Sequence, residues 1–183
     1  GAVAARLSYD AFGRVASRTD SEGYTVTTEY DVLDRPTKTG FPDGTIETYK
    51  WDRLDLVAVT DRAGRMTSFE YDADRNRTAI VDPLKRRTEF TFYPNGTLES
   101  IKDANGNKTT WLRDIESRVT AKVYADGSKR TFAYEPSTSR LLSTTDALGQ
   151  TRNFAYTLDD RLEKLSYANA KIPTATVNFT FDP

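Results

Sequence analysis

The chain has 183 residues, of which 37% are hydrophobic and 29% are charged, with 26 Lys and Arg against 27 Asp and Glu. It contains no Cys and no His, which excludes a disulfide framework, a zinc site of the usual kind and catalysis by a Cys–His or Ser–His–Asp centre. The net charge of −1 predicts no attraction to nucleic acid or to an anionic membrane. No segment is apolar enough to span a bilayer, and no cofactor is expected.

A repeat of about 21 residues runs through the chain. Each copy opens with an aromatic residue and a turn, although Arg113 replaces the aromatic in one degenerate copy. Eight copies fill residues 1–183 and a ninth begins at Phe181, so we expect a single repeat array, excised from a larger protein. The other opening aromatics are Tyr9, Tyr30, Trp51, Tyr71, Phe92, Tyr134 and Tyr156.

Two turns are predicted in each copy. The first reads Tyr-Asp-x-x-Gly-Arg at its clearest, and its Asp is expected to accept backbone N–H bonds in an Asx-turn. The second, about 14 residues into the copy, carries a Gly that reaches positive φ without a Cβ clash, or Lys85 or Ala170 in its place. The first-turn residues are clearest at Tyr9, Asp10, Gly13 and Arg14 and recur at Tyr30 and Asp31, and the second-turn glycines are Gly23, Gly44, Gly64, Gly106, Gly127 and Gly149.

Some copies depart from this pattern. Arg75 and Ser117 replace the first-turn glycine in the fourth and sixth copies, and residues 137–140 carry an insertion. These departures leave the local strand register open, whereas the number of strands is expected to stay the same.

Between the turns lie segments of about seven residues, rich in Thr, Val, Phe and Tyr, that alternate with a period of two. They predict strands, for example over residues 45–51 and 88–92, and almost no helix. Two strands per copy give tandem β-hairpins and about 16 strands in one long antiparallel sheet, an all-β fold. Because open twisted sheets rarely exceed about ten strands without curling, we expect this sheet to curve.

One face of this sheet is predicted to be aromatic and the other to be polar and exposed to solvent. Aromatic residues occur in pairs, and the two members of a pair are two residues apart, so both rings lie on the same face of the sheet. The residue between them lies on the opposite face and is polar or small. We expect the rings to be the buried side of the sheet, covered by another part of the same sheet, another chain or an enclosed cargo. The pairs are Tyr49 and Trp51, Phe69 and Tyr71, Phe90 and Phe92, Phe132 and Tyr134, Phe154 and Tyr156, and Phe179 and Phe181, with Trp111 alone.

The recurring turns resemble those of the Rhs or YD repeat. The Tyr-Asp-x-x-Gly-Arg turn at residues 9–14 and the Tyr-x-Asp-Gly turn at 124–127 are the clearest matches, and Asp-x-x-Gly turns recur at 20–23, 61–64, 103–106 and 146–149. The resemblance implies a strip of hairpins that spirals into a hollow shell around a C-terminal toxic domain, as in bacterial Rhs proteins and the C components of Tc toxins; the animal teneurins have a similar shell. It implies a wall segment of a larger secreted or cell-surface bacterial protein, whose partners are the rest of the shell and the toxin. Residues 1–6 are too short for a secretory signal, and no segment matches the self-cleaving core of the family.

Three other interpretations stay open. The rings could form a carbohydrate-binding or adhesion platform, in which the contacts to ligand or cargo would be Tyr49, Trp51, Phe69, Tyr71, Trp111, Tyr134 and Tyr156. The basic cluster of residues 85–87, flanked by Arg75 and Arg77, could touch sulfated glycans or phosphates, or be a solvated turn. An enzyme built on carboxylates such as Asp159 and Asp160, or a calcium site, is disfavoured. The strip is also expected to self-associate through its edges or its aromatic face.

Overall fold

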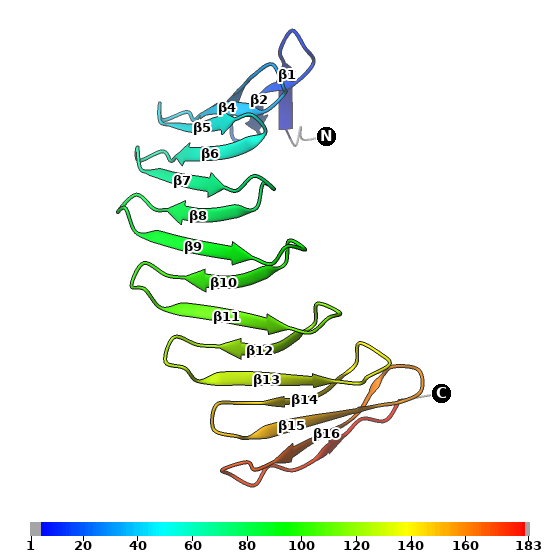
Figure 1. Ribbon diagram of the computed structural model, residues 1–183. Coiled ribbons are helices and arrows are strands. Elements are labelled where there is room, and N and C mark those ends of the chain that lie inside the picture. Colours follow the sequence, from blue (N-terminus) through cyan, green and yellow to red (C-terminus); the bar gives the residue numbers. More distant parts are fainter. Residues whose placement is uncertain (1–4, 182–183) are drawn as a thin grey trace. The chain divides into compact units, whose positions relative to one another are not determined.

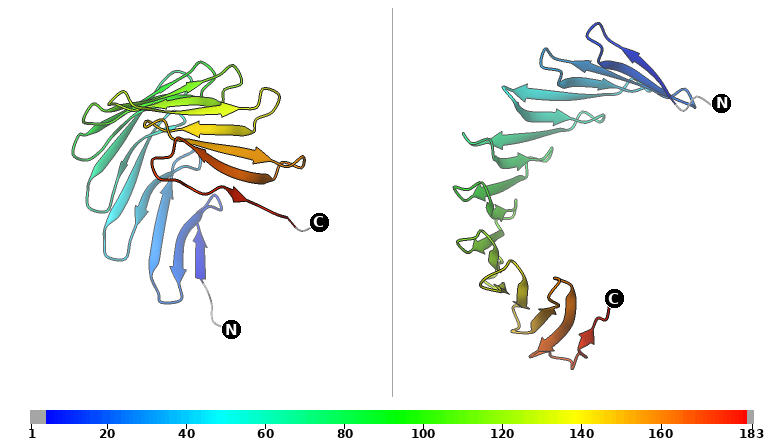
Figure 2. Two further views of the ribbon diagram at one scale, coloured as in Figure 1. Left: turned by 90° about the horizontal axis from the view of Figure 1, so that it is seen from below. Right: turned by 90° about the vertical axis from the view of Figure 1, so that its right-hand side faces the viewer.

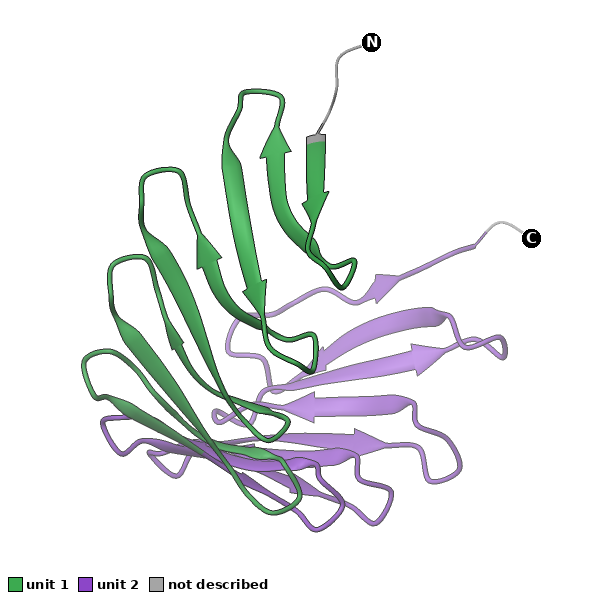
Figure 3. Cartoon of the chain, turned by 90° about the horizontal axis from the view of Figure 1, so that it is seen from above, with its two compact units in different colours: residues 1–89 green, residues 90–183 purple. Residues whose placement is uncertain are grey.

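The computed structural model describes residues 5–181, and the predicted all-β fold is confirmed (Figure 1). Seventeen strands are assigned to one antiparallel sheet, and within the described range no helix is long and apolar enough to cross a membrane. The first four residues, on which part of the expectation about a signal rests, lie outside that range. The chain divides into two compact units, residues 1–89 and residues 90–183, which are described separately (Figure 3).

Unit 1 is a run of antiparallel hairpins in chain order. Each strand pairs with the next, and the predicted strand over residues 45–51 is observed one residue further along as β5. The strands are β1 (Ala5–Tyr9), β2 (Val15–Asp20), β3 (Thr25–Tyr30), β4 (Pro36–Gly40), β5 (Ile46–Asp52), β6 (Asp55–Thr60), β7 (Met66–Tyr71), β8 (Arg77–Val81) and the start of β9 (Arg87–Phe92).

Unit 2 continues the same pattern. It ends differently, however, because the last strand has only two residues, so that Phe179 and Phe181 do not form the strand pair predicted for them. The strands are the end of β9, then β10 (Leu98–Lys102), β11 (Lys108–Arg113), β12 (Val119–Val123), β13 (Lys129–Tyr134), β14 (Leu141–Thr145), β15 (Thr151–Tyr156), β16 (Leu162–Ala168) and β17 (Val177–Asn178).

The turns share one backbone geometry. In the first of them the Asp10 N–H donates to the Arg14 carbonyl at 2.9 Å and the Gly13 N–H donates to the Asp10 carbonyl at 3.1 Å. Gly13 has a φ of 81°, and the register of β1 against β2 shifts by one residue after Ser8. These features describe a type I turn followed by a glycine bulge, which adds twist to the hairpin.

Residues other than glycine take the left-handed position in several copies. Arg75 (φ 67°), Lys85 (φ 65°) and Ser117 (φ 65°) do so where the sequence predicts them to replace glycine. The prediction for Ala170 is wrong, because the left-handed residue of that turn is Asn169 (φ 55°). The short polar side chain of Asn tolerates this conformation better than the methyl group of Ala.

The length of the first turn also varies. The hairpin of β5 and β6 is shorter, with Asp52 directly opposite Asp55 and Arg53 at a φ of 50°. The inserted turn of unit 2 is longer, since the Glu135 N–H reaches the carbonyl of Arg140, five residues on instead of four. The strands on either side pair as in the other hairpins, so the missing residue of one turn and the extra residue of the other stay within the turns.

The distribution of burial corrects the expectation that the rings form the buried side. Within each unit the hairpins form a single layer (Figure 2), and the paired rings are half-buried except for Phe179 and Phe181, which are exposed. The buried residues of the described chain are small and lie on the opposite face: Ala58, Ala79, Ser100 and Ala121. Ala79 is 0% exposed because it sits directly between Glu70 and Glu89, whose longer side chains cover it.

Candidate functional site

The Asp carboxylates at the start of the turns form hydrogen bonds and ion pairs within their own turns. Asp10 Oδ1 accepts the N–H groups of Phe12 at 2.9 Å and Arg14 at 3.0 Å, and its Oδ2 accepts the Arg14 Nε–H at 2.7 Å. This is an Asx-turn closed by an ion pair. The same Asp–Arg pairing recurs at Asp31 with Arg35, Asp61 with Arg65, Asp82 with Arg86 and Asp114 with Arg118.

These bonds hold the carboxylates in the ionised form. The side chain of Arg35, helped by the N–H groups of Arg35 and Leu33, lowers the pKa of Asp31 below its ordinary value of 3.8. The side chain of Arg65 lowers the pKa of Asp61 in the same way. Within residues 5–181, no group of three or more Asp or Glu is placed to hold a metal ion.

Four first-turn arginines also fasten their hairpin to the next. The Arg14 guanidinium lies 4.8 Å from the ring centroid of Tyr30, and its Nη1 donates to the Asp31 carbonyl at 2.7 Å and to Asp34 Oδ1 at 2.8 Å. Such an arginine combines a carboxylate pair, a cation–π contact and a bond to the next turn. Equivalent contacts are made by Arg35 to Trp51 and Arg53, by Arg118 to Tyr134, Glu135 and Thr138, and by Arg140 to Tyr156, Thr157 and Asp160.

A second contact between neighbouring hairpins joins the later hairpin back to the earlier one, and it was not predicted from the sequence. The Tyr30 hydroxyl donates to the Val15 carbonyl at 3.0 Å, fifteen residues earlier. Arg113 replaces the aromatic but keeps a donor, since its Nη2 reaches the Leu98 carbonyl at 3.4 Å. In each of these pairs the donor lies fifteen residues after the acceptor. A side chain with a hydrogen-bond donor at that spacing is the sequence pattern that could have predicted the bond. The same bond joins Trp51 to Pro36, Tyr71 to Leu56, Tyr134 to Val119 and Tyr156 to Leu141.

The residues predicted to contact a ligand or cargo lie at equivalent half-buried places along the aromatic face and do not converge on one cavity. Trp51, Tyr71, Tyr134 and Tyr156 use their polar ends in the bonds just described. Tyr49 donates its hydroxyl to Glu47 Oε2 at 3.0 Å. Phe69 stacks with Arg77 at 5.4 Å, and Trp111 with Lys122 at 5.4 Å.

The basic cluster singled out from the sequence is mostly neutralised. Arg87 pairs with both Glu70 and Glu89, Arg86 with Asp82 at 2.6 Å, and Arg75 with Asp55 at 2.8 Å. These ion pairs leave little free positive charge for an anionic ligand at this turn.

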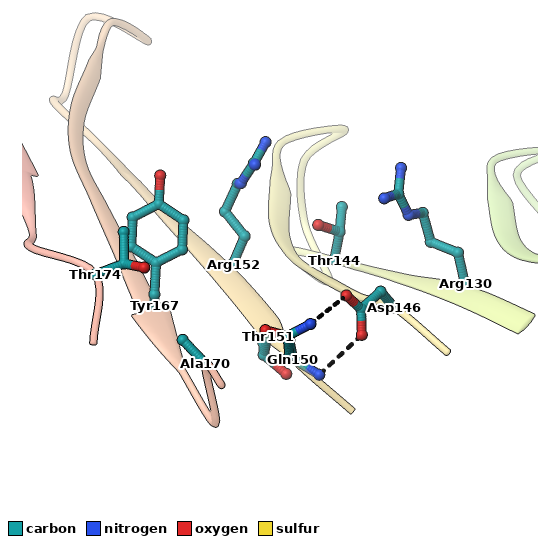
Figure 4. Close-up of a pocket in the computed structure, with 9 residues that line it drawn as sticks. All are labelled: Arg130, Thr144, Asp146, Gln150, Thr151, Arg152, Tyr167, Ala170 and Thr174. Carbon is teal, nitrogen blue, oxygen red and sulfur yellow. Dashed lines mark hydrogen bonds between the residues drawn. The ribbon is translucent and has the colours of Figure 1, made fainter. Parts of the chain in front are cut away.

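Both units contain shallow pockets. In unit 1 a cavity of about 360 Å³ is lined by Phe12, Arg14, Tyr30, Asp31, Val32 and Asp34, all of which belong to two neighbouring first turns. In unit 2 a cavity of about 230 Å³ lies over the second-turn end of β13 to β16 (Figure 4). Its wall includes Arg130, Thr144, Arg152 and Tyr167, and none of these four was singled out from the sequence.

Comparison with known proteins agrees with this geometry. Residues 9–46 and 48–87 match the RHS Repeat family. The chain is 29% identical over 130 residues to double-stranded DNA deaminase toxin A of Burkholderia cenocepacia (strain H111), a match that covers 70% of this chain and 9% of the relative. It is 30% identical over 135 residues to the probable deoxyribonuclease RhsA of Dickeya dadantii (strain 3937), again covering 70% of this chain and 9% of the relative.

A crystal structure of TcdB2-TccC3-Cdc42 shares the fold, with a TM-score of 0.59 and 17% sequence identity over 95% of this chain and 10% of that one. The chain thus spans about a tenth of the length of the relatives that it matches. The family expected from the turn motifs is confirmed. The protein is a structural repeat module, and the chain belongs to the Rhs/YD-repeat family.

Proposed function

We propose that this chain is a wall segment of an Rhs shell that encloses a C-terminal toxin domain and helps to deliver it, within a larger secreted or cell-surface bacterial protein. The observation that carries the proposal is the double fastening of consecutive hairpins. Arg118 binds forward to Glu135 and Thr138, while the hydroxyl of Tyr134 binds back to Val119. The hairpins form a single layer with no second sheet to pack against. Side-chain contacts between neighbouring hairpins must therefore add to the backbone hydrogen bonds that hold the strands together.

The chemistry of the chain supports a wall and not a toxin. The relatives carry the names of a DNA deaminase and a deoxyribonuclease. Zinc-dependent base deaminases coordinate their metal through His and Cys, and this chain has neither. We therefore assign exclusion as the role of this segment and place any toxic activity elsewhere in the protein.

Limited proteolysis of the full-length protein tests the proposal. The double variant Arg118→Ala, Arg140→Ala removes two fastenings, so we expect protease to reach the enclosed domain faster than in the wild type. Arg65→Ala is the matched control, because Arg65 is exposed and, among residues 5–181, its side chain pairs only with Asp61 of its own turn. Equal cleavage rates for the enclosed domain in the wild type, in the double variant and as an isolated domain would refute the enclosure.

A carbohydrate-binding role stays an alternative proposal. Tyr49 and Trp111 favour it, because neither makes the bond to the preceding hairpin that occupies the other polar rings. Glycan-array binding by the chain that falls in Tyr49→Ala and Trp111→Ala would support this role, and unchanged binding would exclude these rings as the platform.

Self-association is proposed as well. Strand β1 pairs only with β2 among the described residues, so its other edge is open to another strand. A monodisperse monomer at high concentration in light scattering would contradict this proposal.

A further inference from the structure

Apart from Arg113, which donates to the carbonyl oxygens of Ser117 and Leu98, three basic side chains on the aromatic face of unit 2 have no acidic partner among the described residues. Lys122 of β12 lies directly opposite Arg130 of β13, and Arg152 of β15 lies directly opposite Thr144 of β14. In the part of the chain that the structure describes, none of the three basic groups forms an ion pair or a hydrogen bond with a carboxylate. We refer to Lys122, Arg130 and Arg152 as the basic row.

The pairing of Lys122 with Arg130 opposes the stability of the sheet. Like charges placed directly across two strands repel each other. Two other hairpins hold uncharged pairs at this position of the repeat, Ile80 opposite Thr88 in unit 1 and Ile101 opposite Thr109 in unit 2. A like-charge pair across two strands with no carboxylate beside it is a sign of function.

The two arginines of the basic row line one cavity. Figure 4 shows Arg130, Thr144, Arg152 and Tyr167 projecting to the same side of the sheet. The strands that carry the two arginines are separated only by β14, so their axes lie about 9.6 Å apart. Two arginine side chains can close that span over a single tetrahedral anion and donate to it in the forked geometry that guanidinium groups favour.

Aromatic rings flank the charges. The Arg152 guanidinium lies 5.7 Å from the ring centroid of Tyr167, and Lys122 Nζ lies 5.4 Å and 4.9 Å from those of Trp111 and Tyr124. These contacts orient the basic groups without neutralising them. Their hydrogen-bond donors remain available to a ligand.

One carboxylate shares the cavity wall. Asp146 Oδ1 accepts the N–H groups of Leu148 at 2.9 Å and Gln150 at 3.0 Å, and its Oδ2 accepts the Gln150 Nε2–H at 3.1 Å. Its charge is therefore directed into its own turn, and the three cations of the basic row exceed it in number.

We propose that the basic row binds a phosphate or sulfate ester. The tetrahedral oxyanion would bridge Arg130 and Arg152 over Thr144, Lys122 would offset its remaining charge, and the group that carries the ester would lie against Tyr167. The cavity of about 230 Å³ is smaller than the roughly 300–1,000 Å³ of pockets for drug-sized ligands, which suits a single ester group with its water.

Thermal unfolding of the 183-residue chain tests the site with inorganic phosphate, inorganic sulfate and sodium chloride at equal ionic strength. A ligand that binds only the folded chain raises Tm. We expect phosphate or sulfate to raise Tm above the chloride value in a saturable way. Comparison of glucose 6-phosphate with glucose 6-sulfate then identifies the ester, since the preferred one gives the larger shift at the same concentration.

The double variant Arg130→Gln, Arg152→Gln should lose the oxyanion-dependent shift, and the chloride Tm of the same variant shows that it still folds. Arg18→Gln is the matched control, because Arg18 occupies in β2 the position that Lys122 occupies in β12 and faces the uncharged Val26. This control should keep the full shift.

Either of two results would overturn the proposal. One is a wild-type shift with phosphate and sulfate no larger than that with chloride. The other is a shift that survives in the double variant or disappears in Arg18→Gln, because the anion would then bind elsewhere. Binding of a long polyanion such as duplex DNA without any response to the small oxyanions would also count against an ester site.

Discussion

The two basic regions of the molecule differ in where their charges are directed. In unit 1 the arginines near residues 85–87 form ion pairs, as Arg87 does with Glu70 and Glu89. In unit 2 the basic row has no such partners among residues 5–181, and its two arginines line a cavity. Adjacency in sequence is a poor guide to free charge, because successive residues of a strand point to opposite faces and long side chains find partners across the sheet.

Acidification should have the largest effect, and it separates the two regions. The side chain of Arg87 lowers the pKa of Glu70 below its ordinary value of 4.5, and hydrogen bonds to Thr45 lower that of Asp43 below 3.8. A carboxyl whose pKa is lower in the folded state contributes stability above its unfolded pKa and loses it as the pH falls through the folded value. We therefore expect Tm to be nearly constant from pH 7 to 5 and to fall steeply below about pH 4.

Calorimetry across that pH range would measure this effect. The variant Arg87→Gln should have a lower Tm than the wild type at pH 7, and the difference should shrink as the pH falls and Glu70 becomes protonated. A difference that is independent of pH would mean that Arg87 stabilises the sheet by packing alone. Arg130→Gln, which removes no ion pair, should show no such pH-dependent difference.

Removing a fastening arginine should have the next largest effect. Arg118 pairs with Asp114 at 2.8 Å, stacks on Tyr134 at 4.9 Å and donates to the Thr138 carbonyl at 2.7 Å. Arg118→Ala should lower Tm by about 5 °C, because it removes all three contacts. Arg65→Ala removes one exposed ion pair and should lower Tm by no more than about 1 °C.

Thermal unfolding of the two alanine variants side by side makes the comparison direct. Arg152→Ala belongs with them, since Arg152 has no acidic partner and its loss should leave Tm in chloride nearly unchanged. Equal losses in the three variants would show that the fastening contacts of Arg118 contribute no more than an ordinary surface charge.

Freeing the charges of unit 1 should have a smaller effect on stability and a qualitative effect on binding. In the double variant Glu70→Gln, Glu89→Gln, Arg87 loses both of its carboxylate partners. We expect Tm to fall by about 2 °C and a second, weaker response to phosphate to appear in unit 1. Retention of the wild-type phosphate response alone would show that free charge without a cavity is not enough to bind the anion.

Most of the fold could be predicted from the repeat. The period, the Asp–Gly turns and the alternation of rings require hairpins in chain order, and even the non-glycine turn positions Arg75 and Ser117 were found. Asn169 was missed because the final loop departs from the period, and β17 is short for the same reason.

The site was harder to predict, because its members are far apart in sequence. Lys122, Arg130 and Arg152 come together only through the register of four strands, which turn lengths decide. Alignment of the repeats does contain one signal, since Lys122 stands where Ile80 and Ile101 stand in other copies. Burial was misjudged for a related reason: ring size suggested a core, whereas small residues such as Ala79 are the ones that their neighbours cover completely.

The smallest expected effect is a gain in stability. Lys122→Ile gives β12 the residue that β8 and β10 carry at this position, Ile80 and Ile101, and relieves the repulsion with Arg130. Cross-strand pairs of this kind differ by about 0.2–1 kcal/mol, so Tm in chloride should rise by about 1–2 °C. The same variant should respond less to phosphate, because the anion loses one of its three cations. A gain in stability together with a loss of binding is the signature of a charge kept for a ligand, whereas a loss of both would show that Lys122 is held in place by its packing against Trp111 and Tyr124.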